Sequence, residues 1–374
     1  MKRTILILVC ASFHVMAYAQ NKPYLIVGTY TGGLSQGIYV YRFDSNTGDV
    51  DSVSMIKTTN PSFLAVSPDE KFVYSVNELA KEGNGGRVSA FAFNKADGKL
   101  AFIDEQPSGG DDPCYISVDK TDKWVAIANY TSGSLSILPI NKTGGLDPAR
   151  TIIQHSGKSI DKERQEGPHV HCTIFSKDDK YLFATDLGLD KIKIYSFNHR
   201  NGTLVQADSP FVSTDPGTGP RHLTFSPSNK YAYLIEEMGG IVSSYQYTNG
   251  KLSLIQTISS LPPDYKGSIG SADIHISSDG NFLYASNRDE SNTIAIFRIN
   301  PQTGMLTPAG YQSTLGKTPR NFNFDPSGNF LLVADQNSDE VVIFRVNKTT
   351  GQLTDSGKRI KVGKPVCIKW ISEK

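Results

Sequence analysis

Two histidines that are separated by one residue, His169 and His171, are candidates for acid–base or metal chemistry. Successive side chains of a β-strand point to opposite faces, so both imidazoles would lie on the same face of one strand. Three interpretations remain open. The rings could be hydrogen-bonded structural histidines, a His-x-His metal pair without an obvious third or fourth ligand, or a general acid or base at neutral pH.

An arginine and a glutamate, Arg221 and Glu237, could supply charge to the same chemistry. They lie near the two ends of residues 219–237, which are typical of a hairpin: an alternating strand, a turn at 226–229, and a second strand that ends in glutamates. Because the two strands of a hairpin run antiparallel, the start of the first lies beside the end of the second. We expect Arg221 and Glu237 to meet at one rim, either as a simple ion pair or as part of a functional site.

The same hairpin recurs along the chain and indicates which elements position these residues. Its copies span residues 61–78, 113–130, 168–187, 272–288 and 319–336. Each copy is followed by a second hairpin, and another precedes the first copy. The turns of these hairpins carry a glycine, at Gly48, Gly98, Gly144, Gly202, Gly250, Gly304 and Gly351. We expect positive φ at these glycines, because short hairpin loops require it.

The two ends of the chain supply one more unit. Three strands are expected at 24–29, 37–43 and 50–56 without a preceding first strand, and a first strand without followers is expected at 365–370. Together they make a seventh four-stranded unit, at a repeat spacing of about fifty residues. We predict an all-β fold, a seven-bladed β-propeller with four-stranded blades, whose ring closes when the N-terminal strands pair with the C-terminal strand.

The propeller geometry predicts where chemistry would take place. First strands line the central channel, and the rim where they begin is the rim where the second strands end. Polar and charged residues gather at both positions, and His169, Arg221 and Arg288 are expected at this rim in neighbouring blades. The loops 155–167 and 261–271 would wall a pocket there. We assign substrate binding at this mouth to Asn129, Asp186, Asp273, Asn287 and Arg320.

Charge and composition argue against several classes of partner. The chain has 38 Lys and Arg, 37 Asp and Glu, and a formal net charge of +1. Near neutrality gives no electrostatic reason to expect nucleic acid or an anionic membrane as partner. The cysteines show no metal-type spacing, and Cys114, Cys172 and Cys367 are interpreted as buried core residues. We predict a monomer that uses no metal and no cofactor.

Residues 1–19 have the composition of a secretory signal peptide. A basic start precedes an apolar stretch at 4–16, and the A-x-A pattern of a cleavage site follows at 17–19. We predict cleavage after Ala19, a mature single-domain propeller at 20–374, and a periplasmic or secreted protein that is free of the membrane after cleavage.

Four sequence runs resemble the seven-bladed propeller lactonase family, which includes the propeller type of 6-phosphogluconolactonase and the fungal carboxy-muconate lactonizing enzymes. They are RQEGPHVH at 164–171, GPRH at 219–222, YAY at 231–233 together with Glu237, and YASNR at 284–288. The likeness covers essentially the whole mature chain, and the runs fall in three successive blades in the family's order.

The resemblance implies a lactone hydrolase whose site combines a histidine, two arginines and a glutamate. Carried over by motif, these residues are His169 or His171, Arg221, Arg288 and Glu237. Glu237 or the histidine would activate water, while the arginines would bind an anionic group and stabilise the oxyanion. Glu236 stands where relatives often have asparagine, and its charge is expected to raise the pKa of one carboxylate.

Three functions remain open on the sequence. The first is hydrolysis of a small sugar lactone, similar to that of 6-phosphogluconolactonase, by water attack and without a metal. Phosphorylated gluconolactone is a cytosolic intermediate, so export favours a different, unphosphorylated lactone. The second function is a non-catalytic propeller that binds a ligand or a protein at the same mouth. The third is a muconate-type cycloisomerase.

Overall fold

The computed structural model describes residues 22–80 and 85–373. The predicted signal peptide, residues 1–19, lies outside this part of the chain. Among the described residues, no helical segment has both the length and the apolar character that crossing a lipid bilayer requires.

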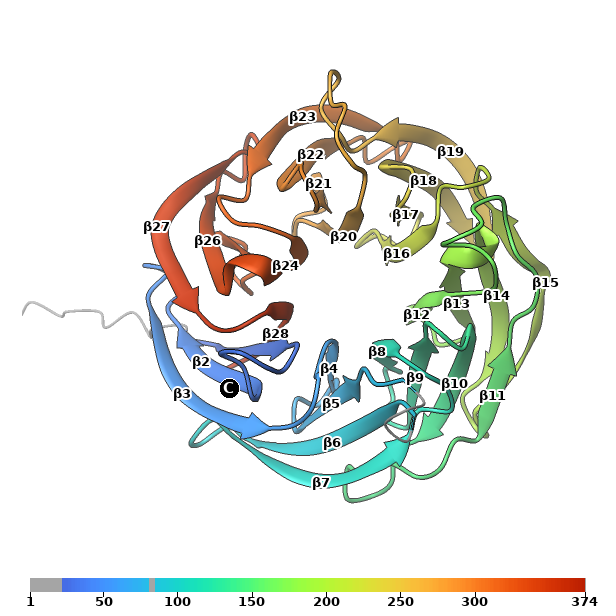
Figure 1. Cartoon of the computed structure of the whole chain (residues 1–374), viewed down its shortest axis with the longest axis horizontal. Helices are drawn as coiled ribbons and strands as arrows, with labels where there is room; N and C mark the ends of the chain where they lie inside the picture. The colour runs from blue at the N-terminus through green and yellow to red at the C-terminus, as the bar shows by residue number, and fades with distance from the viewer. Residues whose placement is uncertain (1–21, 81–84, 374) are drawn as a thin grey trace, which may run out of the picture.

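Within the described residues, 28 strands form seven four-stranded antiparallel sheets around a common axis (Figure 1). The innermost strands are β28 (Pro365–Ile371), β4 (Leu64–Val66), β8 (Pro113–Val118), β12 (Val170–Phe175), β16 (Pro220–Phe225), β20 (Ser271–Ile276) and β24 (Pro319–Phe324). The second strands are β1 (Tyr24–Thr29), β5 (Phe72–Asn77), β9 (Trp124–Asn129), β13 (Tyr181–Asp186), β17 (Tyr231–Glu236), β21 (Phe282–Asn287) and β25 (Phe330–Asp335).

The outer half of each blade is built from two further strands. The third strands are β2 (Gly37–Phe43), β6 (Arg87–Asn94), β10 (Ser134–Pro139), β14 (Lys191–Asn198), β18 (Ile241–Thr248), β22 (Thr293–Ile299) and β26 (Glu340–Val346). The outermost strands are β3 (Val50–Lys57), β7 (Lys99–Pro107), β11 (Thr151–Gln154), β15 (Thr203–Ser213), β19 (Lys251–Ser259), β23 (Leu306–Ser313) and β27 (Leu353–Lys361). Two short 3₁₀ turns, η2 (Leu187–Leu189) and η3 (Gln336–Ser338), follow β13 and β25.

The ring closes as the sequence predicts. β28 pairs antiparallel with β1, with Tyr24 opposite Ile371 and Gly28 opposite Cys367. The blue N-terminal strands and the red C-terminal strand therefore belong to one blade, whose order is β28-β1-β2-β3 (Figure 1). The prediction of a seven-bladed β-propeller is confirmed.

Burial follows position within the blade. Second strands such as β9 and β17 are buried along their whole length, because each blade packs between two neighbours. Outermost strands such as β3 alternate between exposed and partly buried residues, because one face of the strand meets solvent. The apolar core therefore lies between the blades, as where Phe282 and Tyr284 of one blade pack with Phe322 of the next.

The turn glycines allow neighbouring blades to pack closely against each other. All seven predicted hairpin glycines have positive φ, for example +82° at Gly144 and +72° at Gly202. A Cβ atom at Gly144 would lie 1.9 Å from the Phe72 ring, and one at Gly202 would lie 2.3 Å from the Trp124 ring. Both rings begin the second strand of the preceding blade. Glycine is therefore required at these turns by the backbone conformation and also by the contact between blades.

Polar residues at the ends of second strands brace the blades from inside. The carbonyl oxygen of the Asn77 side chain accepts a hydrogen bond from the Ser89 hydroxyl at 2.7 Å. The amide of Asn129 donates to a serine of β10 at 3.1 Å, and the carboxylate of Glu236 accepts from a serine of β18 at 2.5 Å. These buried bonds tie the second strand to the third at the end of the blade that surrounds the mouth.

Asp335 is an exception to this bracing. It is fully buried at the end of β25, and neither carboxylate oxygen has a hydrogen-bond partner among the described residues. The hydroxyl of Thr314 lies close enough to lower the pKa of Asp335, but it donates to the Gly316 carbonyl oxygen at 3.4 Å. Burial outweighs that effect and, together with the charge of Glu340, raises the pKa of Asp335 to about 8.

Replacing Asp335 with asparagine should stabilise the protein in mild alkali. An acid whose pKa is raised by folding costs stability progressively from its unfolded value, 3.8, up to its folded value of about 8. At about pH 9 the free energy of unfolding of the D335N variant should exceed that of the wild type by several kcal/mol, because each unit of pKa shift corresponds to about 1.4 kcal/mol. Near pH 4 the gap should almost vanish. Urea unfolding at both pH values measures it, and a gap that does not change with pH would contradict the assignment.

Candidate active site

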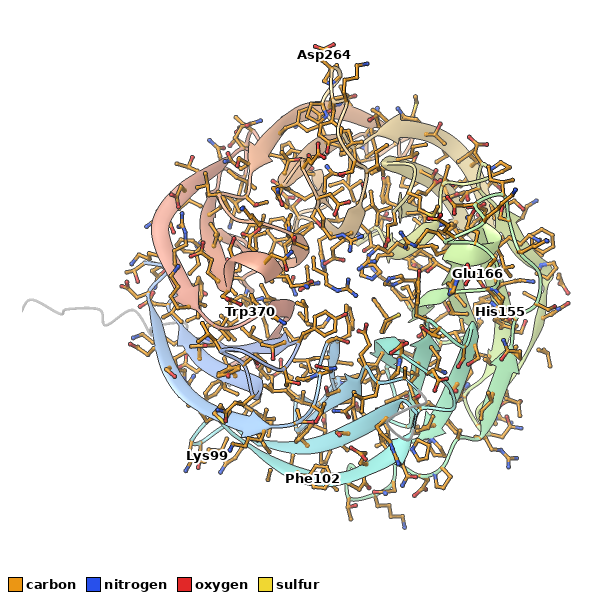
Figure 2. All side chains as sticks on the ribbon, viewed as in Figure 1. Lys99, Phe102, His155, Glu166, Asp264 and Trp370 are labelled. Carbon is orange, nitrogen blue, oxygen red and sulfur yellow. The ribbon has the colours of Figure 1, made fainter. Side chains whose placement is uncertain are left out.

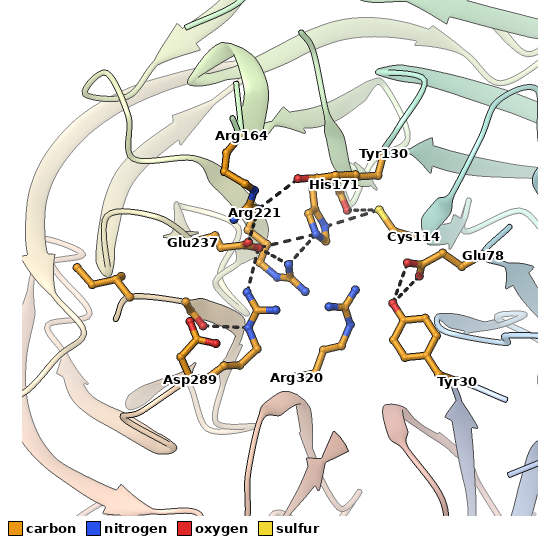
Figure 3. A pocket seen from close by; sticks show the side chains of 13 residues that line it. Tyr30, Glu78, Cys114, Tyr130, Arg164, His171, Arg221, Glu237, Asp289 and Arg320 are labelled. Carbon is orange, nitrogen blue, oxygen red and sulfur yellow. Dashed lines mark hydrogen bonds and ion pairs between the residues drawn. The ribbon is translucent and has the colours of Figure 1, made fainter. Parts of the chain in front are cut away.

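A cavity of about 370 Å³ opens at the rim where the innermost strands begin (Figure 3). This volume suits a small molecule. Most of its residues either stand second in an innermost strand or follow the end of a second strand directly. The cavity is lined by Tyr30, Glu78, Cys114, Tyr130, Arg164, His171, Arg221, Glu237, Ile269, Gly270, Arg288, Asp289 and Arg320.

A repeated β-bulge turns four of these side chains towards the cavity. In β16, Pro220 pairs with the last residue of β17 and His222 pairs with the residue before it, so Arg221 is an extra residue without a partner. The pairing shifts in the same way at Cys114 in β8, His171 in β12 and Arg320 in β24. A bulge re-aims a side chain out of the regular alternation of a strand. One irregularity, repeated in four blades, therefore gathers these residues in one place.

The strand register separates the two histidines. Val170 pairs with the last residue of β13, so His171 stands at the bulge of its blade, as Arg221 does in the next blade. His169 precedes the strand. The sequence-based alignment, which gave His169 that rim position, is wrong by two residues. The His169 ring stacks on Tyr130 with 4.5 Å between ring centroids, and it is His171 that lines the cavity. Among the described residues, no group of three His, Cys, Asp or Glu side chains could hold a metal ion.

Glu237 is the acidic centre of the site. Its Oε2 accepts a hydrogen bond from Arg221 and lies 3.2 Å from Arg288 Nη2, while its Oε1 lies 2.8 Å from Arg164 Nη2. Burial alone would raise the pKa of this carboxyl, but Arg288 and Arg221 hold the pKa well below its usual range. Burial lowers the pKa of Arg288 to about 10, so this guanidinium keeps its charge at neutral pH. One buried carboxylate thus orients three guanidinium groups.

His171 is neutral within the same network. Its Nε2 lies 2.6 Å from Arg221 Nη1, and its Nδ1 lies 3.7 Å from the sulfur of Cys114. A guanidinium can only donate hydrogen bonds, so Nε2 is the acceptor and Nδ1 carries the proton. Burial and the charge of Arg221 lower the pKa of His171 well below its usual value.

Cys114 reaches the cavity, although the sequence suggested a core position. It is one of three free, buried cysteines in the described chain. Burial and the charge of Glu78 raise the pKa of the Cys114 thiol well above its usual value. The thiol is therefore protonated at neutral pH and is a poor nucleophile.

Arg320 faces the cavity and forms no ion pair with an acidic side chain of the described residues. Its guanidinium lies 5.4 Å from the centroid of the Tyr30 ring, and the Tyr30 hydroxyl donates to Glu78 at 2.8 Å. No hydrogen bond or ion pair joins the Arg320 guanidinium to another described residue (Figure 3). Four guanidinium groups and three carboxylates line the cavity. This balance of charge favours an anionic ligand, and all the donors of the Arg320 guanidinium are left to bind one.

Four of the five predicted substrate-binding residues lie outside the cavity lining. Asn129, Asp186 and Asn287 are buried at the ends of second strands and form hydrogen bonds within the protein. The Asp186 carboxylate, for example, lies 2.6 Å from Nδ1 of His155. Asp273 is buried in β20, one residue beyond the position equivalent to Arg221. Arg320 is the member of the predicted set that lines the cavity.

Other cavity residues were not assigned from the sequence: Tyr30, Glu78, Tyr130 and Arg164. The first three directly follow the end of a second strand, as Glu237 and Arg288 do, so position in the repeat could have identified them. Arg164 lies in the loop 155–167, which was predicted to wall the pocket. A loop residue has no equivalent in the repeat, so the pattern could not select it.

Glu236 is oriented away from the arginine network. Its Oε1 accepts a hydrogen bond from the Ser243 hydroxyl at 2.5 Å. Burial raises the pKa of Glu236, with smaller contributions from Asp215 and Asp190. The predicted repulsion between the adjacent glutamates is therefore not the cause of the shift, because burial dominates it and Glu237 has a lowered pKa.

Comparison with known proteins places this chain in a family. The family described as "Lactonase, 7-bladed beta-propeller" matches residues 24–370. A 6-phosphogluconolactonase from Formosa agariphila is 39% identical over 320 residues, which cover 84% of this chain and 90% of that protein.

Solved structures show the same likeness. The structure of a putative 6-phosphogluconolactonase from Bacteroides fragilis matches with a TM-score of 0.90 and 43% identity, over 95% of this chain and 99% of that one. A periplasmic gluconolactonase from Pseudomonas aeruginosa matches with a TM-score of 0.90 and 36% identity, over 94% of this chain and 100% of that one. Because the family match spans all seven blades and the cavity between them, this chain belongs to the seven-bladed β-propeller lactonase family.

Proposed function

We propose that this protein hydrolyses a sugar lactone, an aldonolactone, to the corresponding hydroxy acid. The observation that carries the proposal is the cluster of Arg221, Arg288, His171 and Glu237 at the mouth of the propeller. Several proteins similar to this chain support the same activity, because their names describe lactonases. Water adds to the carbonyl carbon, the ring C–O bond then breaks, and the ring oxygen takes up a proton.

The guanidinium groups stabilise the charge that develops in this reaction. Addition of water places negative charge on the former carbonyl oxygen, and fixed donors in a buried site stabilise that charge more than water does. Arg221 and Arg288 are buried or nearly so, and Glu237 holds both in place before substrate arrives. Glu237 and His171 both have lone pairs occupied by Arg221, so their clearest role is to orient this guanidinium.

Arg320 binds an anionic substituent, such as a phosphate, when the lactone carries one. Replacing it with alanine should raise KM for a phosphorylated aldonolactone by about 10–100-fold, because a hydrogen bond to a charged group contributes about 1.5–3 kcal/mol. KM for the unphosphorylated lactone of the same sugar should change much less. Steady-state kinetics with the two lactones gives the comparison. An equal change for both substrates would contradict an anion-binding role.

A pH-stat assay tests the activity itself. The purified protein is supplied with gluconolactone, its 6-phosphate and other aldonolactones, with and without a chelator. Acid release above the spontaneous rate, unchanged by the chelator, is the expected result. A trace at the spontaneous rate on every lactone would contradict hydrolysis and favour a propeller that only binds its ligand. Loss of activity with the chelator would contradict water attack without a metal.

We also propose that the protein is an exported monomer. The predicted signal sequence at 1–19 supports export, as does the name of the Pseudomonas aeruginosa relative, a periplasmic gluconolactonase. N-terminal sequencing of protein recovered from the periplasm or medium should begin at Gln20. Protein that retains residues 1–19 would contradict cleavage, and light scattering at the mass of a dimer would contradict the monomer.

A further inference from the structure

A histidine and an aspartate form a buried pair beneath the cavity. His222 follows Arg221 in β16, and its Nδ1 lies 2.8 Å from Asp273 Oδ1. The other oxygen of Asp273 lies 3.0 Å from His275 Nε2 and also accepts a hydrogen bond from Asn321. Burial alone would raise the pKa of Asp273, but His275 and His222 hold it well below its usual range. The carboxylate is therefore ionised and fixed from several sides.

The remaining ring nitrogen of His222, Nε2, is available as a hydrogen-bond acceptor. Because Nδ1 faces an ionised carboxylate, Nδ1 carries the proton and Nε2 presents a lone pair. His222 is only 5% exposed, and its Nε2 has no hydrogen-bond partner among the described residues. A buried polar atom without a partner is uncommon and is often matched by an ordered water molecule.

This nitrogen belongs to a small chamber under the main cavity. His222 lines a space of about 10 Å³, roughly the room that one water molecule needs. The chamber and the main cavity share four lining residues: Cys114, His171, Arg221 and Arg320. Their shared walls place the chamber directly below the guanidinium groups of the site.

We infer that His222 is the general base of the hydrolysis and that the chamber below the arginines holds the attacking water against its Nε2. Asp273 is a positioning residue, because it keeps the proton on Nδ1 of His222. The inference rests on the proposed function. As the water oxygen forms a bond to the lactone carbonyl carbon, one water proton passes to Nε2 and the carbonyl oxygen becomes negative beside the arginines. His222 then returns the proton to the ring oxygen as the ring C–O bond breaks.

The two other bases of the arginine network, Glu237 and His171, are already occupied. The carboxylate of Glu237 is bound by three guanidinium groups, and Nε2 of His171 faces Arg221 at 2.6 Å. To take a proton from water, either group would have to give up a charge-assisted hydrogen bond, and such bonds are about twice as strong as neutral ones. His222 loses no protein contact when its Nε2 accepts a proton.

The His222 ring is locked in orientation by its neighbours. It packs edge-on against Tyr115, His171 and Phe63, with ring centroids 5.2, 5.4 and 5.9 Å away. Burial lowers the pKa of His222 to about 4, although Asp273 opposes the change, so the base is free at neutral pH. The titratable or charged groups that face it are Asp273 of β20, Arg221 of β16, Arg320 of β24, His171 of β12 and Tyr115 of β8.

Replacing His222 with asparagine tests the inference. The introduced amide can still donate to Asp273, but it cannot accept a proton. H222N should lower kcat by about 10²–10⁴-fold, the usual contribution of a general base, with KM little changed. Wild-type kcat should fall only as the pH drops towards about 4. In H222N this fall should be absent, and residual kcat should rise with hydroxide concentration. Asp273→Asn should also lower kcat. It gives an independent variant if H222N folds poorly.

His155 provides a matched control, because it also forms a buried pair with an aspartate. Its Nδ1 lies 2.6 Å from Asp186 Oδ2, but it sits away from the axis of the ring and does not line either cavity (Figure 2). H155N should lose stability and keep kcat. An active wild type together with H222N that retains kcat, or that changes only KM, would overturn this inference alone. A wild type without lactonase activity would overturn the proposed function and the inference with it.

Discussion

Replacing Arg221 with alanine should lower kcat/KM for lactone opening by about 10²–10³-fold, the usual cost of removing one donor from an oxyanion site. Arg221 is 2% exposed, is bound to Glu237, and stands at the bulge that aims it into the cavity. No other described guanidinium contacts both Glu237 and His171. The substitution therefore removes a hydrogen-bond donor from the cavity, and Glu237 and His171 also lose their contact with it. Steady-state kinetics on the most rapidly opened lactone measures the effect.

Arg164 is the matched control for this variant. It binds the same carboxylate at 2.8 Å, but its side chain is 46% exposed and belongs to a loop. Exposed ion pairs contribute about 0–1 kcal/mol, so Arg164→Ala should change kcat/KM by no more than about fivefold. The account would be contradicted if the two arginine variants lost activity equally, or if R221A stayed within tenfold of the wild type.

Replacing Glu237 with glutamine should lower the free energy of unfolding by about 3–5 kcal/mol, the usual effect of removing one partner from a buried ion pair. The variant leaves Arg221 and Arg288 close together without a neutralising charge. The folded pKa of Glu237 is below the unfolded value of 4.5, so its contribution is complete above that value and is lost as the pH falls towards the folded pKa. Urea unfolding near pH 7 should show the full difference, and the difference should shrink in acid.

Glu236 supplies the comparison for the stability measurement. It is the adjacent buried carboxyl group, but burial raises its pKa and its partner is the neutral Ser243. Glutamine at this position keeps an oxygen for the Ser243 hydroxyl and removes the cost of a buried charge. E236Q should therefore be as stable as the wild type or more stable. Equal losses in E236Q and E237Q would show that the arginine cluster does not stabilise Glu237.

Much of the fold follows from the sequence because each blade repeats the same local chemistry. The alternation of Leu223 and Phe225 with polar residues, the turn at 226–229 and the hairpin glycine recur in blade after blade. The pairing of 24–29 with the C-terminal strand also followed, because both ends lacked a partner. The contact between Arg221 and Glu237 could be expected for the same reason, since antiparallel strands bring these positions together.

The finer assignments depended on single-residue register, which the repeat alone does not fix. A shift of one residue turns a side chain to the other face of a strand. Asn129 ends its strand and is buried in the blade, whereas Tyr130, the next residue, lines the cavity. The bulge that selects His171 over His169 is not visible in a pattern of apolar residues. His222 was overlooked because its partner, Asp273, is 51 positions away in the chain.

The most direct test of the central claim is a crystal structure of the protein with the aldonate product bound. The account predicts the product carboxylate within about 2.7–3.2 Å of the Arg221 guanidinium, the range of a hydrogen bond, with Arg288 or Arg320 also in contact. The sugar chain should extend towards the open mouth. A fully ordered product that binds elsewhere on the propeller, with no contact to these three arginines, would contradict the account.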